Sequence, residues 1–169
     1  MSAHTRTVFD VDLQDLMRMV AEMGGLAERQ FVQAFDALIQ RNTELAQQVI
    51  NRDALLDALQ AKIEEKGINI IAQRQPLAND LREIIAALHI LNDLERIGDL
   101  AKNISKRTIA IGSEILPKSL ISGLEHMTRM VLGQFKMALD SYAGRDVSEA
   151  LAVRNGDLQI DALNNALFQ

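Results

Sequence analysis

An internal repeat is the feature of this sequence that most constrains its fold. When the chain is aligned with itself at an offset of 104 residues, Gln30 and Phe31 match Gln134 and Phe135. Over the following residues, this ungapped alignment also matches Ala34 with Ala138, Asp36 with Asp140, Arg41 with Arg145, Ala46 with Ala150, Val49 with Val153, Asn51 with Asn155, Asp53 with Asp157, Asp57 with Asp161, Ala58 with Ala162 and Leu59 with Leu163. Because repeat units pack against their neighbours to bury a shared face, we expect one complete copy and part of a second.

Apolar residues recur with the helical period, and turn residues separate the helical segments. We expect five helices, over residues 10–41, 43–75, 76–111, 117–143 and 147–169. Asp10 suits the first N-cap, and either Asn42 or Thr43 suits the N-cap of the second helix. Asp146, which the repeat matches with Asn42, suits the N-cap of the fifth helix. Pro76 suits the first turn of the third helix, and Gly112 ends that helix.

The composition favours an all-α fold. Of the 169 residues, 48% are apolar but only 4% are aromatic, so the core must consist mainly of aliphatic side chains and methionine. Short links between long amphipathic helices favour antiparallel neighbours. We therefore expect tandem repeated three-helix bundles: a complete first bundle over residues 8–111, and an incomplete second bundle with two helices over residues 112–169.

The charge and the termini exclude several classes of function. A net charge of -5 disfavours binding to the phosphate backbone of nucleic acids, and it disfavours insertion among anionic lipids. No apolar run approaches the length of a membrane span, and the first seven residues contain no apolar stretch typical of a secretory signal. The absence of cysteine excludes thiolate ligands and agrees with a reducing compartment. We expect a cytoplasmic protein.

Pairs of acidic residues at helical spacing are the candidate metal ligands. Asp53 and Asp57 lie four residues apart, as do Glu95 and Asp99, so each pair places two carboxylates on one helix face. Oxygen ligands of this kind suit hard cations. The helical wheel directs both pairs away from the apolar stripes, which predicts a site on the bundle surface. The repeat copies the first pair as Asp157 and Asp161.

Acids on a polar helix face are also compatible with simple solvation, and Lys102 and Lys106 can relieve the charge of Asp99. Gly98, between Glu95 and Asp99, indicates close approach of another helix or of a ligand. A di-iron enzyme would need Glu-x-x-His, which does not occur. We interpret Thr43 and Ser113 as helix caps and identify no catalytic residue. The chain should not be an enzyme.

Two segments resemble a known family. Residues 74–82 and 91–104, and above all the sequence Asp-Leu-Glu-Arg-Ile-Gly-Asp-Leu-Ala-Lys-Asn-Ile over residues 93–104, are similar to the PhoU proteins, accessory regulators of phosphate-specific transport. Met23-Gly-Gly-Leu-Ala27 in the first helix is similar too. The resemblance covers essentially the whole chain. It implies a fold of two repeated three-helix bundles.

The resemblance also implies a function and a cofactor. Family members bind multinuclear iron or zinc clusters through Glu/Asp-x-x-x-Asp motifs, which here correspond to Asp53, Asp57, Glu95 and Asp99, with Asp157 and Asp161 in the second copy. They are negative regulators that couple the phosphate ABC transporter to a sensor histidine kinase. The same role would bring this chain to the inner membrane through protein partners only. The alternatives are a metal-free helical interaction scaffold and a carboxylate-metal enzyme.

The partial second copy predicts self-association. The family's last helix, with its second acidic motif, has no counterpart before Gln169. The apolar stripes of the fourth and fifth helices then need another cover. We expect a homodimer or larger assembly that buries Leu120, Leu124, Met127, Val131, Phe135, Ala138, Tyr142, Leu151, Ile160, Leu163 and Leu167.

Overall fold

The structure is a computed structural model that describes the backbone of residues 3–112 and 115–168 and the side chains of residues 8–112 and 115–166. The chain is all-α, as the sequence predicts, and the described residues form five helices and no strand. They are α1 (Ala3–Gln40), α2 (Thr43–Arg74), α3 (Asn79–Ile111), α4 (Lys118–Gly144) and α5 (Val147–Phe168). Ser113 and the side chain of Leu167 lie outside the described residues.

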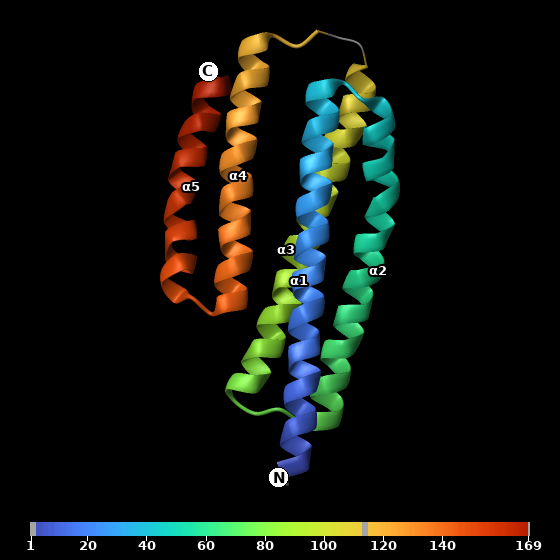
Figure 1. The fold of residues 1–169 in the computed structure, drawn as a ribbon, viewed down its shortest axis with the longest axis vertical. Coiled ribbons are helices and arrows are strands. Elements are labelled where there is room, and N and C mark those ends of the chain that lie inside the picture. The colour runs from blue at the N-terminus through green and yellow to red at the C-terminus, as the bar shows by residue number, and fades with distance from the viewer. Residues whose placement is uncertain (1–2, 113–114, 169) are drawn as a thin grey trace.

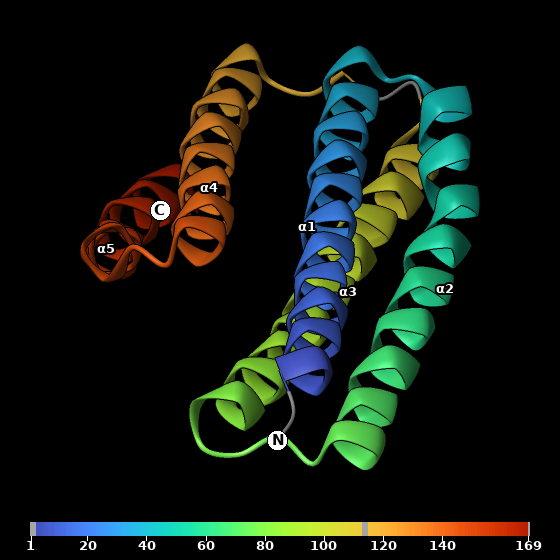
Figure 2. The ribbon, with the colours of Figure 1, turned by 60° about the horizontal axis from the view of Figure 1, so that its bottom comes forward.

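Helices α1, α2 and α3 pack against one another as a long bundle, and α4 lies alongside α1 (Figures 1 and 2). Within the described residues, α5 packs only against α4, on the side away from the bundle. The hairpin of α4 and α5 therefore depends on α4 for its attachment. The domain division expected at residues 111 and 112 stays a prediction.

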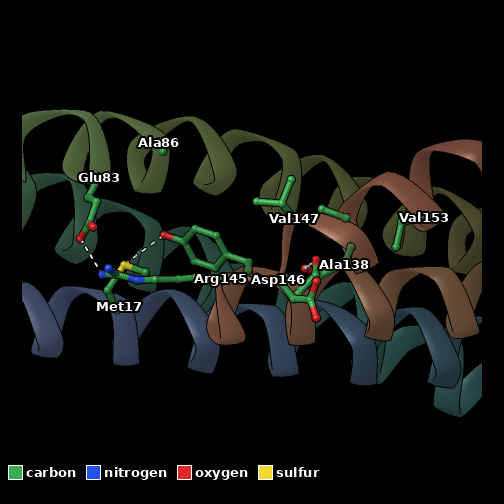
Figure 3. Close-up of a pocket in the computed structure, with 11 residues that line it drawn as sticks. Met17, Glu83, Ala86, Ala138, Arg145, Asp146, Val147 and Val153 are labelled. Atoms are coloured by element: carbon green, nitrogen blue, oxygen red, sulfur yellow. Dashed lines mark hydrogen bonds and ion pairs between the residues drawn. The ribbon is translucent and has the colours of Figure 1, made fainter. Parts of the chain in front are cut away.

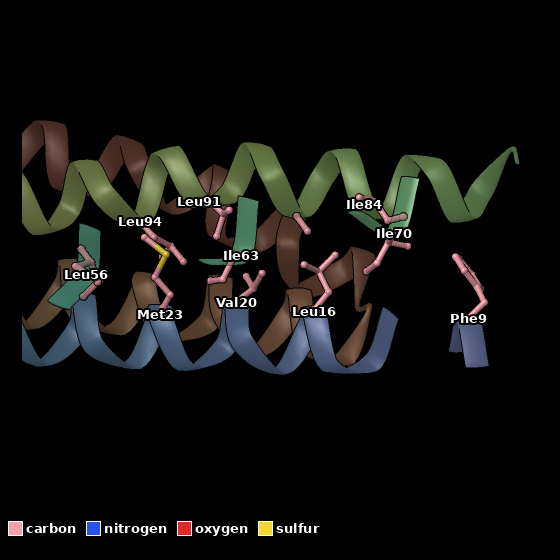
Figure 4. Packing of buried hydrophobic residues seen from close by; sticks show 12 residues of the cluster. Phe9, Leu16, Val20, Met23, Leu56, Ile63, Ile70, Ile84, Leu91 and Leu94 are labelled. Carbon is pink, nitrogen blue, oxygen red and sulfur yellow. The ribbon is translucent and has the colours of Figure 1, made fainter. Parts of the chain in front are cut away.

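An aliphatic core holds the first three helices together (Figure 4). Its fully buried large side chains come from all three helices: Leu16, Val20, Met23, Leu56, Ile63, Ile84 and Leu91. Each stabilises the fold by about 1.5–3 kcal/mol through removal of apolar surface from water. In the part of the chain that the structure describes, no helix is both long and apolar enough to cross a bilayer.

The two copies of the repeat turn in the same way. Arg41 and Arg145, which the repeat aligns, both adopt the left-handed conformation, with φ of 53° and 54°. The next residues, Asn42 and Asp146, then cap the following helix: their side-chain oxygens accept hydrogen bonds of 2.9 and 3.0 Å from the backbone N–H groups three residues on. Both predicted caps are confirmed, and with them the structural equivalence of the two turns.

Three contacts hold α4 against the bundle. Leu139 packs against α1 at Gly24, where a Cβ atom would lie only 2.7 Å from the leucine Cδ2 atom. The absence of a side chain at Gly24 therefore permits a close crossing of α1 and α4. Beyond it, the Tyr142 hydroxyl group donates to Met17 Sδ at 3.1 Å. Arg145 then pairs with Glu83 of α3 at 2.9 Å.

Two predicted helix starts are wrong. Asp10 is not an N-cap, because α1 already begins at Ala3; Phe9 is only 6% exposed in the core, and its burial extends the helix beyond the local signal. Helix α3 begins at Asn79 and not at Pro76. Gln75 and Ala78 both have positive φ, of 49° and 50°, so residues 75–78 form the reversal that joins the antiparallel helices α2 and α3.

Candidate metal-binding surface between α2 and α3

Helices α2 and α3 approach closely at Gly98. A Cβ atom at this position would overlap the Cδ2 atom of Leu56, which is itself 1% exposed. Only a residue without a side chain therefore permits this spacing. The sequence-based expectation of a close helix approach at Gly98 is confirmed, and it brings the acidic residues of the two helices to one surface.

The four acids of the first copy lie within electrostatic reach of one another. Burial raises the pKa of Glu95 above its usual value, and the charges of Asp99, Asp57 and Asp53 raise it further. The effect of Asp57 and Asp53 on Glu95 acts between α2 and α3. An arrangement of this kind is unfavourable for ionised carboxylates unless a cation compensates it. Asp57 and Asp99 are exposed, whereas Glu95 is partly buried.

Asp53 is buried, and its sequence-based placement on the outer surface is wrong. The residue is only 4% exposed, because α1 and α3 both pack against α2. Its Oδ2 atom accepts a hydrogen bond from Nζ of Lys102 on α3. The same ammonium group lies 3.7 Å from Asp99 Oδ1. Lys102 thus compensates a buried acid across the helix interface as well as the neighbouring acid that sequence spacing indicated.

A second polar group points at the same place. Gln30 of α1 is 4% exposed, and its Oε1 atom has no hydrogen-bond partner. A Cβ atom at Gly98 would lie 3.1 Å from this oxygen and 3.6 Å from Asp53 Oδ1. Two oxygen acceptors, from two different helices, therefore converge at Gly98. A buried acceptor without a donor costs free energy, so this point is suited to a cation or to another donor.

These residues fit a metal cluster by chemistry. Carboxylate and amide oxygens are ligands of hard cations, and Asp53, Asp57, Glu95, Asp99 and Gln30 supply them from three helices. Across the described ranges, no three His, Asp or Glu side chains are already gathered tightly enough to hold one ion. The ammonium group of Lys102 lies between two of the acids. Movement of Lys102 is therefore a requirement for ligation by Asp53 and Asp99 together.

The second-copy acids lie elsewhere. Asp157 and Asp161 are exposed on α5, and α5 contacts only α4 among the described helices. The structure does not bring them to the surface between α2 and α3. A separate cavity of about 500 Å³ lies between the α4–α5 hairpin and helices α1 and α3, and it is lined mostly by small and apolar side chains together with the Arg145–Glu83 ion pair (Figure 3). Its lining suits apolar contacts more than metal ligation.

Sequence reasoning missed the role of Gln30 and the cross-helix role of Lys102. A signal for Lys102 was present, since it lies one helical turn after Gly98 and therefore on the face of α3 that meets α2. The only sequence signal for Gln30 was its identity with Gln134 in the repeat. Its burial depends on three helices packing at one level, which no single-helix pattern encodes.

The sequence of this chain is similar to those of PhoU proteins over nearly its whole length. The PhoU domain model matches residues 20–108 and 124–169. The phosphate-specific transport system accessory protein PhoU homolog of Rhizobium meliloti is 45% identical over 167 residues, which cover 99% of this chain and 70% of that relative. The homolog of Zymomonas mobilis is 42% identical, over 98% of this chain and 70% of the relative.

Solved structures of PhoU proteins also match this chain. The crystal structure of PhoU from Pseudomonas aeruginosa matches with a TM-score of 0.89 and 34% identity, over 94% of this chain and 76% of the other. The phosphate transport system regulatory protein PhoU from Streptococcus pneumoniae matches with a TM-score of 0.87 and 28% identity, over 94% and 74% of the two chains. The helical fold, the repeat and these matches over nearly the whole sequence lead to one conclusion: the chain belongs to the PhoU family.

Proposed function

We propose that this chain is a negative regulator of phosphate uptake and of phosphate-starvation signalling. The observation that carries the proposal is 45% identity, over 99% of the chain, to a relative named as an accessory protein of the phosphate-specific transport system. The proposed role is to couple a phosphate ABC transporter to a sensor histidine kinase when phosphate is plentiful. Binding, and not catalysis, would carry this role.

The shape of the molecule suits protein partners. Its long helices present extended faces, and large apolar side chains are exposed on several of them, including Leu55, Ile68 and Leu100 at 59%, 60% and 51%. A net charge of -5 disfavours direct attachment to anionic lipid. We therefore propose a cytoplasmic protein that reaches the inner membrane through the transporter or the kinase.

We further propose that the surface between α2 and α3 holds a multinuclear iron or zinc cluster. Asp53, Asp57, Glu95 and Asp99 would be its ligands, and the metal would supply the positive charge that these mutually repelling carboxylates lack. The unpaired oxygen of Gln30 beside Asp53 supports a cation at this point. Asp157 and Asp161, exposed on α5, would be ligands at a second site.

Self-association through α4 and α5 is part of the proposal. Every apolar side chain described on these two helices remains at least partly exposed, and Val147, Leu151 and Leu158 are 73%, 46% and 75% exposed. Phe135 and Tyr142, which the second copy was expected to cover, pack instead against the core of the three-helix bundle. A two-fold arrangement would pair the α4–α5 hairpin of one chain with that of a second copy in a four-helix bundle, and it would bury the apolar side chains of the hairpin that the three-helix bundle leaves open.

Disruption of the gene tests the regulatory role. Phosphate uptake and the output of a phosphate-starvation reporter are measured at high phosphate, with and without a plasmid that carries the gene. The expected result is a reporter that stays on at high phosphate after disruption and is turned off again by the plasmid. A reporter that responds to phosphate normally in the disrupted strain contradicts the proposal.

A metal-free helical scaffold is the second candidate. The observation in its favour is the Lys102–Asp53 ion pair, which already neutralises the most buried acid of the surface. Analysis of iron and zinc in protein purified without chelator distinguishes the two. The carboxylate-metal enzyme has no supporting constellation among the described residues, and an oxidase and hydrolase screen on the same sample tests it.

A further inference from the structure

We propose that Lys102 is a built-in counter-ion that competes with metal for the surface between α2 and α3. In this role it sets how tightly the surface binds a cation. The inference rests on the proposed metal site, and it assigns a specific function to a residue that lies outside the acidic motifs. A bound cation and the Lys102 ammonium group would then be alternative occupants of the same carboxylates.

The position of the Lys102 ammonium group explains why it would compete with a bound metal. Nζ of Lys102 donates to Oδ2 of Asp53 and lies 3.7 Å from Oδ1 of Asp99, so one ammonium group contacts an acid on each helix. Both acids are proposed ligands. A cation bound to them would lie within a few Å of the ammonium group, and two positive charges at that separation repel strongly. The ammonium group must therefore leave when the metal binds.

Burial explains why a counter-ion is needed. Asp53 has a side chain that is 6% exposed, and a buried carboxylate without a partner is strongly destabilising. Its other oxygen, Oδ1, is directed toward Gly98 and the unpaired Oε1 atom of Gln30. Lys102 neutralises only one side of this carboxylate. A metal would neutralise the carboxylate and also give Gln30 Oε1 a partner.

Lys102 can leave the site without disturbing the core. Its side chain is 29% exposed, and a lysine side chain has four flexible methylene groups that let the ammonium group turn into solvent. Exchange between lysine and metal thus requires a side-chain rotation and no helix movement. Asp53 would keep a positively charged partner in both states, which protects the fold around Gly98 when metal is scarce.

The chain offers a matched control lysine. Lys66 of α2 pairs with Asp15 of α1 at 2.8 Å, and its side chain is 26% exposed. Asp15 also pairs with Arg18 at 2.7 Å, so it keeps a cation when Lys66 is removed. Lys66→Met therefore removes the same charge and the same kind of interhelical ion pair at a position outside the acidic surface.

The experiment measures Mn²⁺ binding to the chelator-treated full chain by calorimetry and by the electron paramagnetic resonance signal of free Mn²⁺. The proteins are wild type, Lys102→Met and Lys66→Met. Lys102→Gln is included as a second variant, because its neutral amide can still donate to Asp53 and preserve the fold. Thermal unfolding is recorded with and without Mn²⁺.

We expect Lys102→Met and Lys102→Gln to bind Mn²⁺ about tenfold more tightly than wild type or more, because a like charge has been removed. Lys66→Met should bind as wild type does. Without metal, Lys102→Met should unfold at a lower temperature, and Mn²⁺ should raise that temperature more than it does for wild type.

Equal or weaker Mn²⁺ affinity in both Lys102 variants would overturn the competition while leaving the metal site in place. Binding by the Lys102 variants but not by wild type would support the competition, and it would contradict a metal cluster in the unaltered protein. Absence of binding in all four proteins would overturn both the competition and the metal site.

Discussion

The hydroxyl group of Tyr142 on α4 donates a hydrogen bond of 3.1 Å to the sulfur atom of Met17 on α1. Tyr142 is the only tyrosine of the chain, and the chain has no tryptophan. Its ultraviolet absorbance and fluorescence therefore report on a single place, the contact between the α4–α5 hairpin and the three-helix bundle. This contact can be followed without any added label.

Tyr142 should make the stability of the folded protein sensitive to alkaline pH. Burial, supported by the charge of Glu83 and opposed by that of Arg145, raises the pKa of Tyr142 to about 12 from an ordinary value of 10.0. In the folded state the proton is kept, whereas the unfolded chain releases it near pH 10. The tyrosine contribution to stability is thus complete below pH 10 and is lost as pH rises to 12, by about 1 kcal/mol after allowance for solvent screening.

Absorbance titration of tyrosinate tests this directly. The midpoint should lie near 12 in the folded protein and near 10 in denaturant. In denaturant unfolding, Tyr142→Phe should not show the part of the stability loss between pH 10 and 12 that comes from ionisation of Tyr142. A folded-state midpoint at the unfolded value would show that Tyr142 is not buried against the bundle.

Leu139→Ala should loosen the hairpin. Leu139 packs against α1 at Gly24, so its truncation removes this contact between α4 and α1 and costs about 2 kcal/mol of docking free energy. Hydrogen exchange should become faster in α4 and α5 and remain unchanged in the core of α1, α2 and α3. Leu55→Ala, at a side chain of α2 that is 59% exposed and lies outside the hairpin, is the control and should leave hydrogen exchange in all five helices unaffected.

The turns were the most predictable part of the fold. Asn42 and Asp146 carry a local signal, an N-cap side chain at matched positions of the repeat, and the structure confirms both caps. The all-α class followed from periodicity in the same way. Helix starts at Ala3 and Asn79 were not predictable, because tertiary burial of Phe9 and a four-residue reversal decided them.

Gly98→Ala tests the close approach of α2 and α3. Its added Cβ atom overlaps the buried side chain of Leu56, so we expect a loss of about 1–3 kcal/mol in the free energy of unfolding. Gly133 on α4 is the matched control, since nothing lies within 4 Å of a Cβ atom there. Gly133→Ala should stabilise the protein by up to about 1 kcal/mol. Equal effects in urea unfolding would contradict the helix spacing.

The acidic surface was predictable in its members but not in its geometry. Spacing identified both acidic pairs, the repeat supported Asp53 and Asp57, and Gly98 indicated the close approach. The helical wheel failed for Asp53, because it places a residue relative to one apolar stripe, whereas α2 has neighbours on two sides. The pairing of Asp53 with Lys102 depends on the register between two helices, which the sequence of either helix does not contain.

Self-association is expected to depend on the hairpin. Light scattering over a concentration series should show a dimer or larger assembly, and Leu151→Glu should shift it toward the monomer by placing a charge in the apolar interface. Leu55→Glu, at a side chain of α2 that is 59% exposed, is the control and should leave the assembly intact. A monomer at every concentration would mean that the hairpin does not bind a second copy.

The iron and zinc content of protein purified without chelator tests most directly the proposal that the carboxylates between α2 and α3 bind metal. The double variant with Glu95→Ala and Asp99→Ala should lose the metal found in wild type. In the metal-free proteins, its free energy of unfolding should differ from that of wild type by only about 1 kcal/mol. Asp157→Ala with Asp161→Ala removes the same charge from α5 and should retain most of the metal. Full metal content in the Glu95/Asp99 double variant would contradict the assigned site.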